Sequence, residues 1–184
     1  FYTQHTEEFY DFYKNKMIFL DAKPNKAHLK LAEMEQAGKL SAIVTQNIDG
    51  LHQAAGSKNV FELHGSVHRN YCQKCGKFFD VNYVVNAKGV PYCDECGGII
   101  KPDVVLYEEG LDSQTINGAV RAISKADMLI IGGTSLVVYP AAGMIDYFKG
   151  KYLAVLNRDA TSRDKQADLC ITDPIGEVLG RIRV

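Results

Sequence analysis

The chain has 184 residues, 46% of them hydrophobic and 23% charged, so it can bury one sizeable core, with or without a small satellite module. Lys and Arg together number 21, Asp and Glu number 22, and the net charge is −1. This composition excludes a disordered tail, and the charge balance argues against nucleic acid as a partner, because phosphate-neutralising proteins carry a basic excess.

No part of the sequence is typical of a membrane or secreted protein. The longest aliphatic run, Met128 to Ile131, is far shorter than the ~20 apolar residues that span a bilayer. The N-terminus lacks a basic segment followed by an apolar one, as a signal peptide would have. We therefore expect a soluble, cytoplasmic protein without a membrane partner. Because the chain starts at Phe1 rather than Met, we also expect that an upstream segment is missing.

Two helices are predicted in the first part of the chain. Residues 7–17 carry aromatic side chains at positions 9, 10, 12 and 13, and residues 1–24 are expected to form part of a small helical module. Residues 25–37 have apolar positions at helical spacing with charges between them. This second segment begins at Asn25 and is followed by Gly38, which suits the position after a helix.

Alternating strands and helices are predicted for the remainder. Short aliphatic runs, typical of strands buried on both faces, lie at 42–44, 59–63, 128–131, 152–156 and 169–172. Helices are predicted at 115–125, 141–149 and 175–184. This alternation predicts an α/β fold, with a Rossmann-like, mostly parallel sheet and helices on both faces. Residues 1–69 and 102–184 would form that domain, and residues 70–101 a zinc-binding module.

Four cysteines form the pattern Cys-x2-Cys-x17-Cys-x2-Cys, at Cys72, Cys75, Cys93 and Cys96. This spacing is typical of a zinc ribbon, in which each Cys-x2-Cys turn supplies two sulfur ligands. Two disulfides are the alternative, but nothing in the sequence indicates an oxidising compartment. Because four thiolates leave no open coordination position, we expect one structural Zn²⁺ per chain.

Polar residues follow several predicted strands, at the sheet edge where ligands of parallel sheets bind. Gln46, Asn47 and Asp49 could hold a carboxamide, or they could serve only an Asx-type turn. His64 could act as a general base at physiological pH, although a lone His is more often structural. We assign structural roles to the other three mid-chain histidines, His28, His52 and His68.

Two later strand ends carry weaker signals. The segment from Gly132 to Ser135 could bring its backbone and hydroxyls close to a phosphate or ribose, or could be only a glycine turn before a helix. Asn157 could bind a ribose hydroxyl or only form a turn. Cys170 is expected to be a small buried residue within its strand.

Taken together, these motifs resemble those of the sirtuins. Five segments occur in the family's order: Thr45 to His52, Leu63 to Ser66, the paired cysteines, Lys101 to Val105, and Gly133 to Leu136. The resemblance covers the chain from about Glu7 to its C-terminus. It implies an NAD-dependent protein deacylase of the bacterial type.

The resemblance implies a role for each matched residue. Gln46, Asn47, Ile48 and Asp49 would form the nicotinamide pocket, and His64 would be the catalytic base. The ADP-ribose part of NAD would lie along Gly133, Thr134, Ser135, Asn157, Arg158 and the backbone around Cys170. Val105 and Tyr107 would line the acyl-lysine tunnel. Residues 105–109, including Glu108, and residues 136–138, including Val137, would hold the substrate peptide between them as an added strand.

The implied reaction removes an acyl group, such as acetyl, from a protein lysine and yields nicotinamide and O-acyl-ADP-ribose. Acyl-lysine proteins or peptides would be the partners, and NAD and Zn²⁺ the cofactors. The alternative is a nonenzymatic zinc-ribbon interaction module on an α/β scaffold.

Two departures from the family pattern carry expectations of their own. Glu108 stands where the family often has Gly, which suggests a preference for substrates with nearby Lys or Arg. The family's Gly-Ala-Gly segment, which contacts the cofactor, is absent, so we expect little activity from residues 1–184 alone and an incompletely covered sheet.

Overall fold

The computed structural model describes all 184 residues, from Phe1 to Val184, and they divide into two compact units. Unit 1 comprises Phe1–Ala22, Asn47–Gly50 and His64–Gly110. Unit 2 comprises Lys23–Gln46, Leu51–Leu63 and Leu111–Val184. Each unit has its own buried apolar clusters, one in unit 1 and three in unit 2. None of the helices combines the length and apolar character needed to cross a bilayer.

Unit 1 begins with the helix predicted at residues 7–17. It forms as α1 (Thr6–Phe12) and continues as a π-helical turn, η1 (Tyr13–Met17). Phe9, Tyr10 and Tyr13 fall on one side of this helix and are buried together, in edge-on and stacked ring contacts. The Tyr10 hydroxyl donates a hydrogen bond to the Ile100 carbonyl at 2.5 Å, which ties the helix to the far strand of the unit's sheet.

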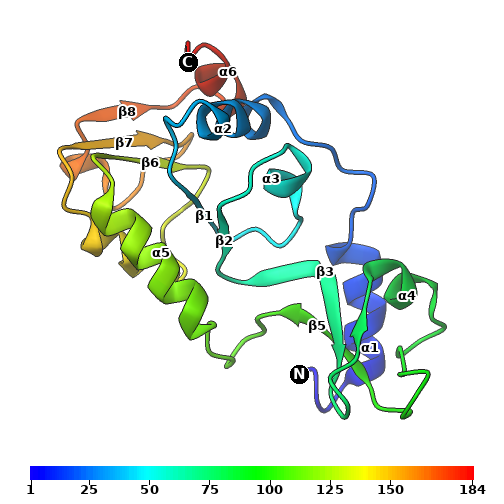
Figure 1. Cartoon of the computed structure of the whole chain (residues 1–184). Helices are drawn as coiled ribbons and strands as arrows, with labels where there is room; N and C mark the ends of the chain where they lie inside the picture. The colour runs from blue at the N-terminus through cyan, green and yellow to red at the C-terminus, as the bar shows by residue number, and fades with distance from the viewer. The chain divides into compact units, whose positions relative to one another are not determined.

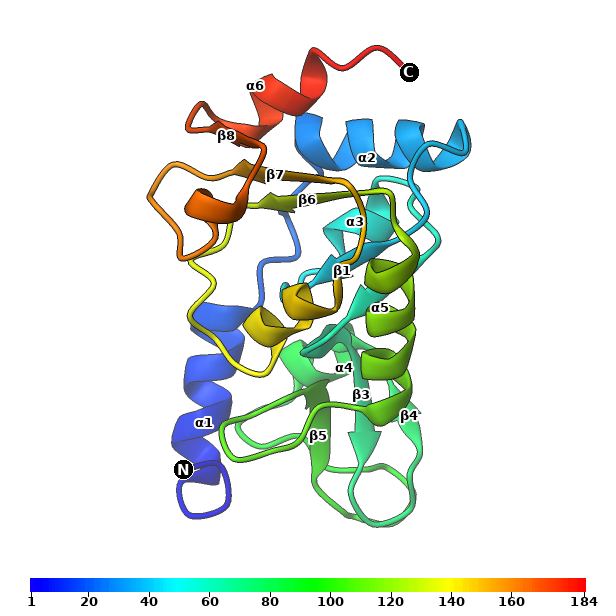
Figure 2. The ribbon, with the colours of Figure 1, turned by 90° about the vertical axis from the view of Figure 1, so that its left-hand side faces the viewer.

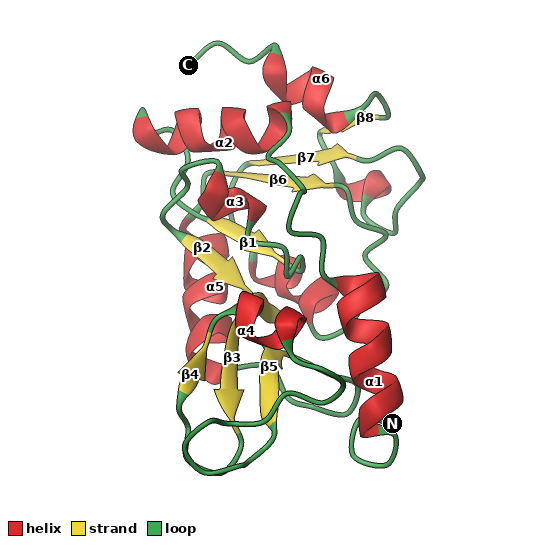
Figure 3. Ribbon diagram, turned by 90° about the vertical axis from the view of Figure 1, so that its right-hand side faces the viewer, coloured by secondary structure: helices red, strands yellow, loops and turns green.

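The sheet of unit 1 is antiparallel and has the order β4-β3-β5 (Figure 3). Its strands are β3 (Gly65–Cys72), β4 (Phe78–Phe79) and β5 (Ile100–Val104). A short helix, α4 (Val81–Asn86), follows β4 and is capped at its N-terminus by Asp80, whose carboxylate accepts the Tyr83 N–H at 2.9 Å. The central strand β3 contains a bulge between Ser66 and Asn70, where the pairing with β5 shifts register.

Unit 2 holds the five strands predicted from aliphatic runs, and every pair among them is parallel. β1 (Ile43–Thr45) pairs with β2 (Val60–Glu62) in a two-stranded sheet. A second sheet has the order β6-β7-β8, with β6 (Met128–Gly132), β7 (Tyr152–Leu156) and β8 (Leu169–Ile171). The predicted parallel arrangement is confirmed, in two sheets rather than one.

Helices cover both faces of the β6-β7-β8 sheet, as predicted (Figures 1 and 2). On one face, α2 (Lys26–Gln36) and α6 (Ile175–Gly180) pack together against Ile130, Leu156 and Ile171. On the other face, the 3-10 helix η2 (Ala141–Tyr147) packs against Ile131 and Leu153. Two further short helices of unit 2 are α3 (Leu51–Ala54) and η3 (Asp164–Gln166).

The longest helix of unit 2 is α5 (Ser113–Lys125), which agrees with the prediction at residues 115–125. Its Ala119 and Ile123 are buried with Leu63 and Met144, so α5 closes the core that also contains the β1-β2 pair. α2 agrees with the prediction at residues 25–37: the Asn25 side chain caps its first turn, and Gly38 follows it at φ +69°.

Three details of the prediction were wrong. Of the five strands, only β7 is buried along nearly its whole length, because β6 and β8 lie at the edges of their sheet; Met128 and Leu169 are each about half exposed. The segment predicted as a helix at 141–149 is a 3-10 helix that ends at Tyr147. The last helix stops at Gly180. The division into a Rossmann-like domain and a zinc module at residues 70–101 stays a prediction.

Candidate active site and metal centre

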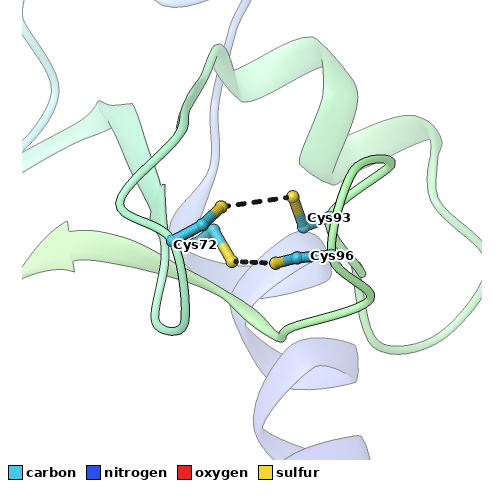
Figure 4. A group of neighbouring side chains, drawn as sticks. Cys72, Cys93 and Cys96 are labelled. Carbon is cyan, nitrogen blue, oxygen red and sulfur yellow. Dashed lines mark hydrogen bonds between the residues drawn. The ribbon is translucent and has the colours of Figure 1, made fainter.

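The four predicted zinc ligands lie together in unit 1 (Figure 4). The Sγ atoms of Cys72 and Cys96 are 3.4 Å apart, those of Cys75 and Cys93 are 3.7 Å apart, and all four lie within 4.8 Å of one another. A tetrahedral zinc with bonds of about 2.3 Å requires sulfur separations of about 3.8 Å. A disulfide requires about 2.05 Å, and all four cysteines are free thiols. The donor set therefore fits one Zn²⁺.

Each cysteine pair is shaped by a tight turn that ends in glycine. The Gly76 N–H donates to the Cys72 carbonyl at 2.9 Å, and the Gly97 N–H donates to the Cys93 carbonyl at 3.0 Å. Gly76 and Gly97 have φ values of +75° and +68°, a region that residues with a side chain rarely adopt. The sequence therefore needs glycine directly after each Cys-x2-Cys turn.

Without a metal, the four neighbouring thiols cannot all ionise easily, and their pKa values differ widely. Burial opposes ionisation of Cys72, but hydrogen bonds from the backbone N–H groups of Cys75 and Lys74 and from the thiols of Cys96 and Cys75 together lower the pKa of Cys72 to about 6. The Lys77 N–H favours the Cys75 thiolate, yet the neighbouring thiols and burial raise the pKa of Cys75 to about 12. One thiolate thus hinders the next, because like charges repel. A bound Zn²⁺ would hold all four as thiolates.

His64 lies immediately before β3 and directly after the buried Leu63, and it is half-buried. Its backbone carbonyl accepts the Val105 N–H at 3.1 Å, which joins it to the residue that follows β5. The next residue, Gly65, has φ +74°, and a Cβ built there would overlap the Asp103 carbonyl. The backbone on both sides of the imidazole is therefore fixed by the β3-β5 pairing.

The segment Asn47–Gly50 belongs to the same unit as His64 and is bound to the same strand. The Val67 N–H donates to the Ile48 carbonyl at 3.0 Å, and Ile48 packs against the core of unit 1. His68 Nε2 lies 3.0 Å from the Asp49 carbonyl oxygen, so His68 has the structural role that the sequence predicted. The structure thus brings three predicted nicotinamide residues, Asn47, Ile48 and Asp49, to the strand that His64 precedes.

The predicted ADP-ribose residues lie in unit 2, at the carboxyl edge of the β6-β7-β8 sheet. Gly132 and Leu156 are register partners at the ends of β6 and β7, so Gly133 and Asn157 follow from adjacent positions. The Gly133 N–H donates to the Leu156 carbonyl at 3.1 Å, with Gly133 at φ +62°. Thr134, Ser135 and Arg158 follow these turns, and neither the Ser135 hydroxyl nor the exposed Arg158 guanidinium has a partner within the chain.

Cys170 lies in β8, as predicted, but it is exposed rather than buried. Its Sγ lies 3.6 Å from the Asp164 carbonyl oxygen. The prediction of a buried residue was wrong because β8 pairs only with β7 and forms one edge of its sheet.

The two predicted peptide-binding segments lie one in each unit. Val105, Tyr107 and Glu108 follow β5 in unit 1, and Tyr107 is fully exposed. Val137 lies in unit 2 after the glycine turn and is 71% exposed.

Sequence reasoning missed the ion pair between Lys101 and Glu109. Lys101 Nζ and the Glu109 carboxylate are 3.0 Å apart, and this pair holds the turn after β5. Lys101 and Glu109 are eight residues apart, a separation that no helix or strand periodicity relates.

A groove of about 550 Å³ lies in unit 2, between α2 and α6. Its lining includes Leu29, Lys30, Glu33 and Arg181, and it contains none of the predicted site residues. Its lining carries charges of both signs, so the groove selects no ligand class.

Comparison with known proteins identifies the family. The model of the Sir2 family matches residues 1–140. The chain belongs to the Sir2 family. It is 66% identical over 180 residues to an NAD-dependent protein deacetylase of Clostridium acetobutylicum, covering 97% of this chain and 74% of that protein. It is 63% identical over 183 residues to the enzyme of the same name from Clostridium perfringens, covering 99% of this chain and 75% of that protein.

Solved Sir2 structures match nearly all of this chain. One, described as "Sir2-p53 peptide-NAD+", matches with a TM-score of 0.92 and 41% identity, over 98% of this chain and 78% of that one. Another contains the inhibitor EX-527, 2'-O-acetyl-ADP-ribose and deacetylated p53 peptide, and matches with a TM-score of 0.91 and 43% identity, over 98% and 80% of the two chains. The predicted sirtuin resemblance, α/β fold and NAD-dependent deacetylase activity are confirmed.

Proposed function

We propose that this Sir2 chain removes acetyl groups from lysine side chains of proteins or peptides, with consumption of NAD and formation of nicotinamide and O-acetyl-ADP-ribose. The observation that carries this proposal is the Sir2 structure in which 2'-O-acetyl-ADP-ribose and a deacetylated peptide are bound together, since these are the two products expected here. That structure matches 98% of this chain at 43% identity, which supports the proposal.

NAD, when bound, supplies an electrophilic ribose carbon and nicotinamide as a leaving group. The ADP-ribose part would be held at the carboxyl edge of the β6-β7-β8 sheet, where ligands of parallel sheets bind. The hydroxyl of Ser135 and the guanidinium of Arg158 suit ribose and phosphate oxygens, because neither is engaged within the chain. Gly133 suits close backbone approach, since a Cβ there would meet nothing within 4 Å. Thr134, Asn157 and the backbone around Cys170 would complete this part of the site.

Gln46, Asn47, Ile48 and Asp49 would bind the nicotinamide ring and its carboxamide. An amide side chain can donate to and accept from a carboxamide at the same time, and a carboxylate accepts its N–H groups. The carbonyls of Ile48 and Asp49 are engaged by Val67 and His68, which fixes the backbone of this segment. Fixed donors and acceptors orient a ligand at a low entropic cost.

His64 would accept a proton from a ribose hydroxyl at an imidazole nitrogen, and so make that oxygen a nucleophile. An imidazole suits this step because its usual pKa lies near the operating pH. Val105 and Tyr107 would line the path of the acyl-lysine side chain. Glu108 and Val137 would lie beside the peptide backbone, which would bind as an added strand.

The test is mass spectrometry of an acetyl-lysine peptide incubated with the protein, with and without NAD, alongside a His64→Ala variant. The proposal expects loss of 42 Da from the peptide, about the mass difference between acetyl and hydrogen, only when NAD and His64 are both present. Deacetylation without NAD would instead indicate a hydrolase of another class. The low activity expected for residues 1–184 alone stays a prediction, and the same assay measures it.

A further inference from the structure

The turn after β5 is locked by one of its two glutamates. The Glu109 N–H donates to the Leu106 carbonyl at 3.0 Å, and the Glu109 carboxylate accepts the Leu106 N–H at 2.9 Å. The same carboxylate pairs with Lys101 Nζ at 3.0 Å, and Lys101 Nζ also donates to the Val104 carbonyl at 3.2 Å. These contacts fix the backbone of the turn on both sides of Glu108, which lies at its tip.

That residue, Glu108, has an unfavourable backbone conformation. Its φ is +73°, in the left-handed region where residues with a side chain are disfavoured. Leu136, at φ +57°, is the only other non-glycine residue of the chain with a positive φ. These two residues lie in the two segments that were assigned to the substrate peptide, 105–109 and 136–138. Such conformations persist where the surrounding structure enforces them and are concentrated at functional sites.

The Glu108 carboxylate is exposed and makes no hydrogen bond or ion pair within the chain, in contrast to Glu109. No other charged residue occurs in either of the two peptide-binding segments without a partner, since 105–107 and 136–138 carry no charge. Glu108 is therefore the one unpaired charge that these segments offer to a flanking residue of a bound peptide.

We propose that Glu108 is a specificity-determining residue that favours acyl-lysine substrates with Lys or Arg close to the modified lysine. This inference rests on the proposed function. A single exposed carboxylate a few ångströms from a guanidinium changes an affinity by about three- to fivefold at low salt. The same carboxylate repels a flanking Asp or Glu. The ratio of the affinities for basic and acidic peptides therefore reflects both the attraction of one and the repulsion of the other.

The experiment uses two fluorescein-labelled acetyl-lysine peptides that differ only in two flanking residues, both Arg in one and both Glu in the other. For each peptide, kcat/KM is measured with NAD and Kd by fluorescence anisotropy. Glu108→Gln keeps the size of the side chain and removes its charge. We expect this variant to lower the Arg-to-Glu preference by about fivefold or more, and high salt to reduce the difference between variant and wild type.

Glu7→Gln is the matched control. Glu7 is exposed, lies in the same unit, and has no partner within the chain, so this variant changes the net charge equally. We expect Glu7→Gln to leave the peptide preference unchanged. A similar loss of preference in both variants would mean that the overall charge steers the peptide, and that result would overturn the role of Glu108.

The outcomes separate this inference from the proposed function. If the wild-type protein deacetylates both peptides with NAD and Glu108→Gln leaves their ratio unchanged, the inference is wrong and the proposed function stands. If no peptide is deacetylated, the anisotropy ratio still decides the role of Glu108. If neither peptide binds, both proposals fail.

Discussion

Gly65 lies so close to the Asp103 carbonyl oxygen that the two backbones leave no room for a side chain at position 65. This contact lies between β3 and β5, one residue after His64, and Gly65 is held at φ +74°. The contact therefore couples the strand pairing of unit 1 to the backbone of the proposed catalytic histidine.

Replacement of Gly65 by Ala should destabilise the protein by about 3 kcal/mol, from the left-handed φ and from overlap with Asp103. Gly89→Ala is the matched control, because Gly89 has φ +64° but a Cβ there would meet nothing within 4 Å. It should cost only about 1 kcal/mol. Urea denaturation of both variants measures the difference. If both lose the same free energy of unfolding, β3 and β5 can move apart at position 65 without cost, and the prediction is wrong.

Loss of the zinc site should unfold unit 1 before unit 2. Cys72 and Cys93 are part of the buried core of unit 1, so a zinc ion bound to them would tie that core together. Cys96→Ser should abolish stoichiometric zinc and destabilise unit 1 by about 5 kcal/mol or more. Cys170→Ser, at an exposed thiol of unit 2, should keep the zinc content and the melting temperature. Metal analysis and thermal denaturation would test both, and a Cys96→Ser protein with wild-type stability would contradict a structural zinc.

His64→Ala should lower NAD-dependent deacetylation by about 10²- to 10⁴-fold, the contribution typical of a general base. Zinc content should be unchanged, because the four cysteines lie elsewhere in the chain. His5→Ala is the control: His5 is exposed and contacts only Glu8 and Phe1 among the charged and aromatic side chains. A His64→Ala variant that keeps more than about a tenth of the wild-type rate would remove His64 from the proposed mechanism.

The first turn of α5 should contribute to acid sensitivity. Hydrogen bonds from the Thr115 N–H and hydroxyl lower the pKa of Asp112 below its usual 3.8. Because the folded state favours the carboxylate, its stabilising effect is complete above the unfolded pKa and is lost as the pH falls through the lower folded pKa. Asp112→Asn keeps a capping oxygen without a titrating group. Urea denaturation at neutral pH and at about pH 3 should therefore show a smaller loss for the variant than for wild type.

The strands that could be predicted are those whose buried residues form a regular pattern in the sequence. β7 matches its predicted bounds because Leu153 to Leu156 form an unbroken buried aliphatic run. β3 was missed because its bulge interrupts the alternation of apolar and polar residues. β5 was missed because Pro102 stands in its middle, and a proline argues against an inner strand. Both strands are stabilised by pairing between distant segments, which no local pattern records.

The site was predictable to the extent that motifs identify residues. The cysteine spacing predicted a cluster that the structure confirms, because ligand spacing is itself a geometric constraint. Ion pairs such as Arg69–Asp103 and Lys101–Glu109 join positions 34 and eight residues apart with no sequence signal. The positive φ of Glu108 was equally invisible, since the residue is not one that usually adopts it.

The strand order of the β6-β7-β8 sheet predicts that its amide protons are protected unequally from exchange with solvent. β7 has a hydrogen-bonded neighbour on each side, whereas β6 and β8 each have one. Amide protons along β7 should therefore exchange with deuterium more slowly than those along either flanking strand, because opening them requires disruption of two ladders. Within this sheet, the segment from Leu153 to Leu156 would then be the last to label, after both flanking strands, so the loops at the carboxyl edge extend from a slowly exchanging central strand.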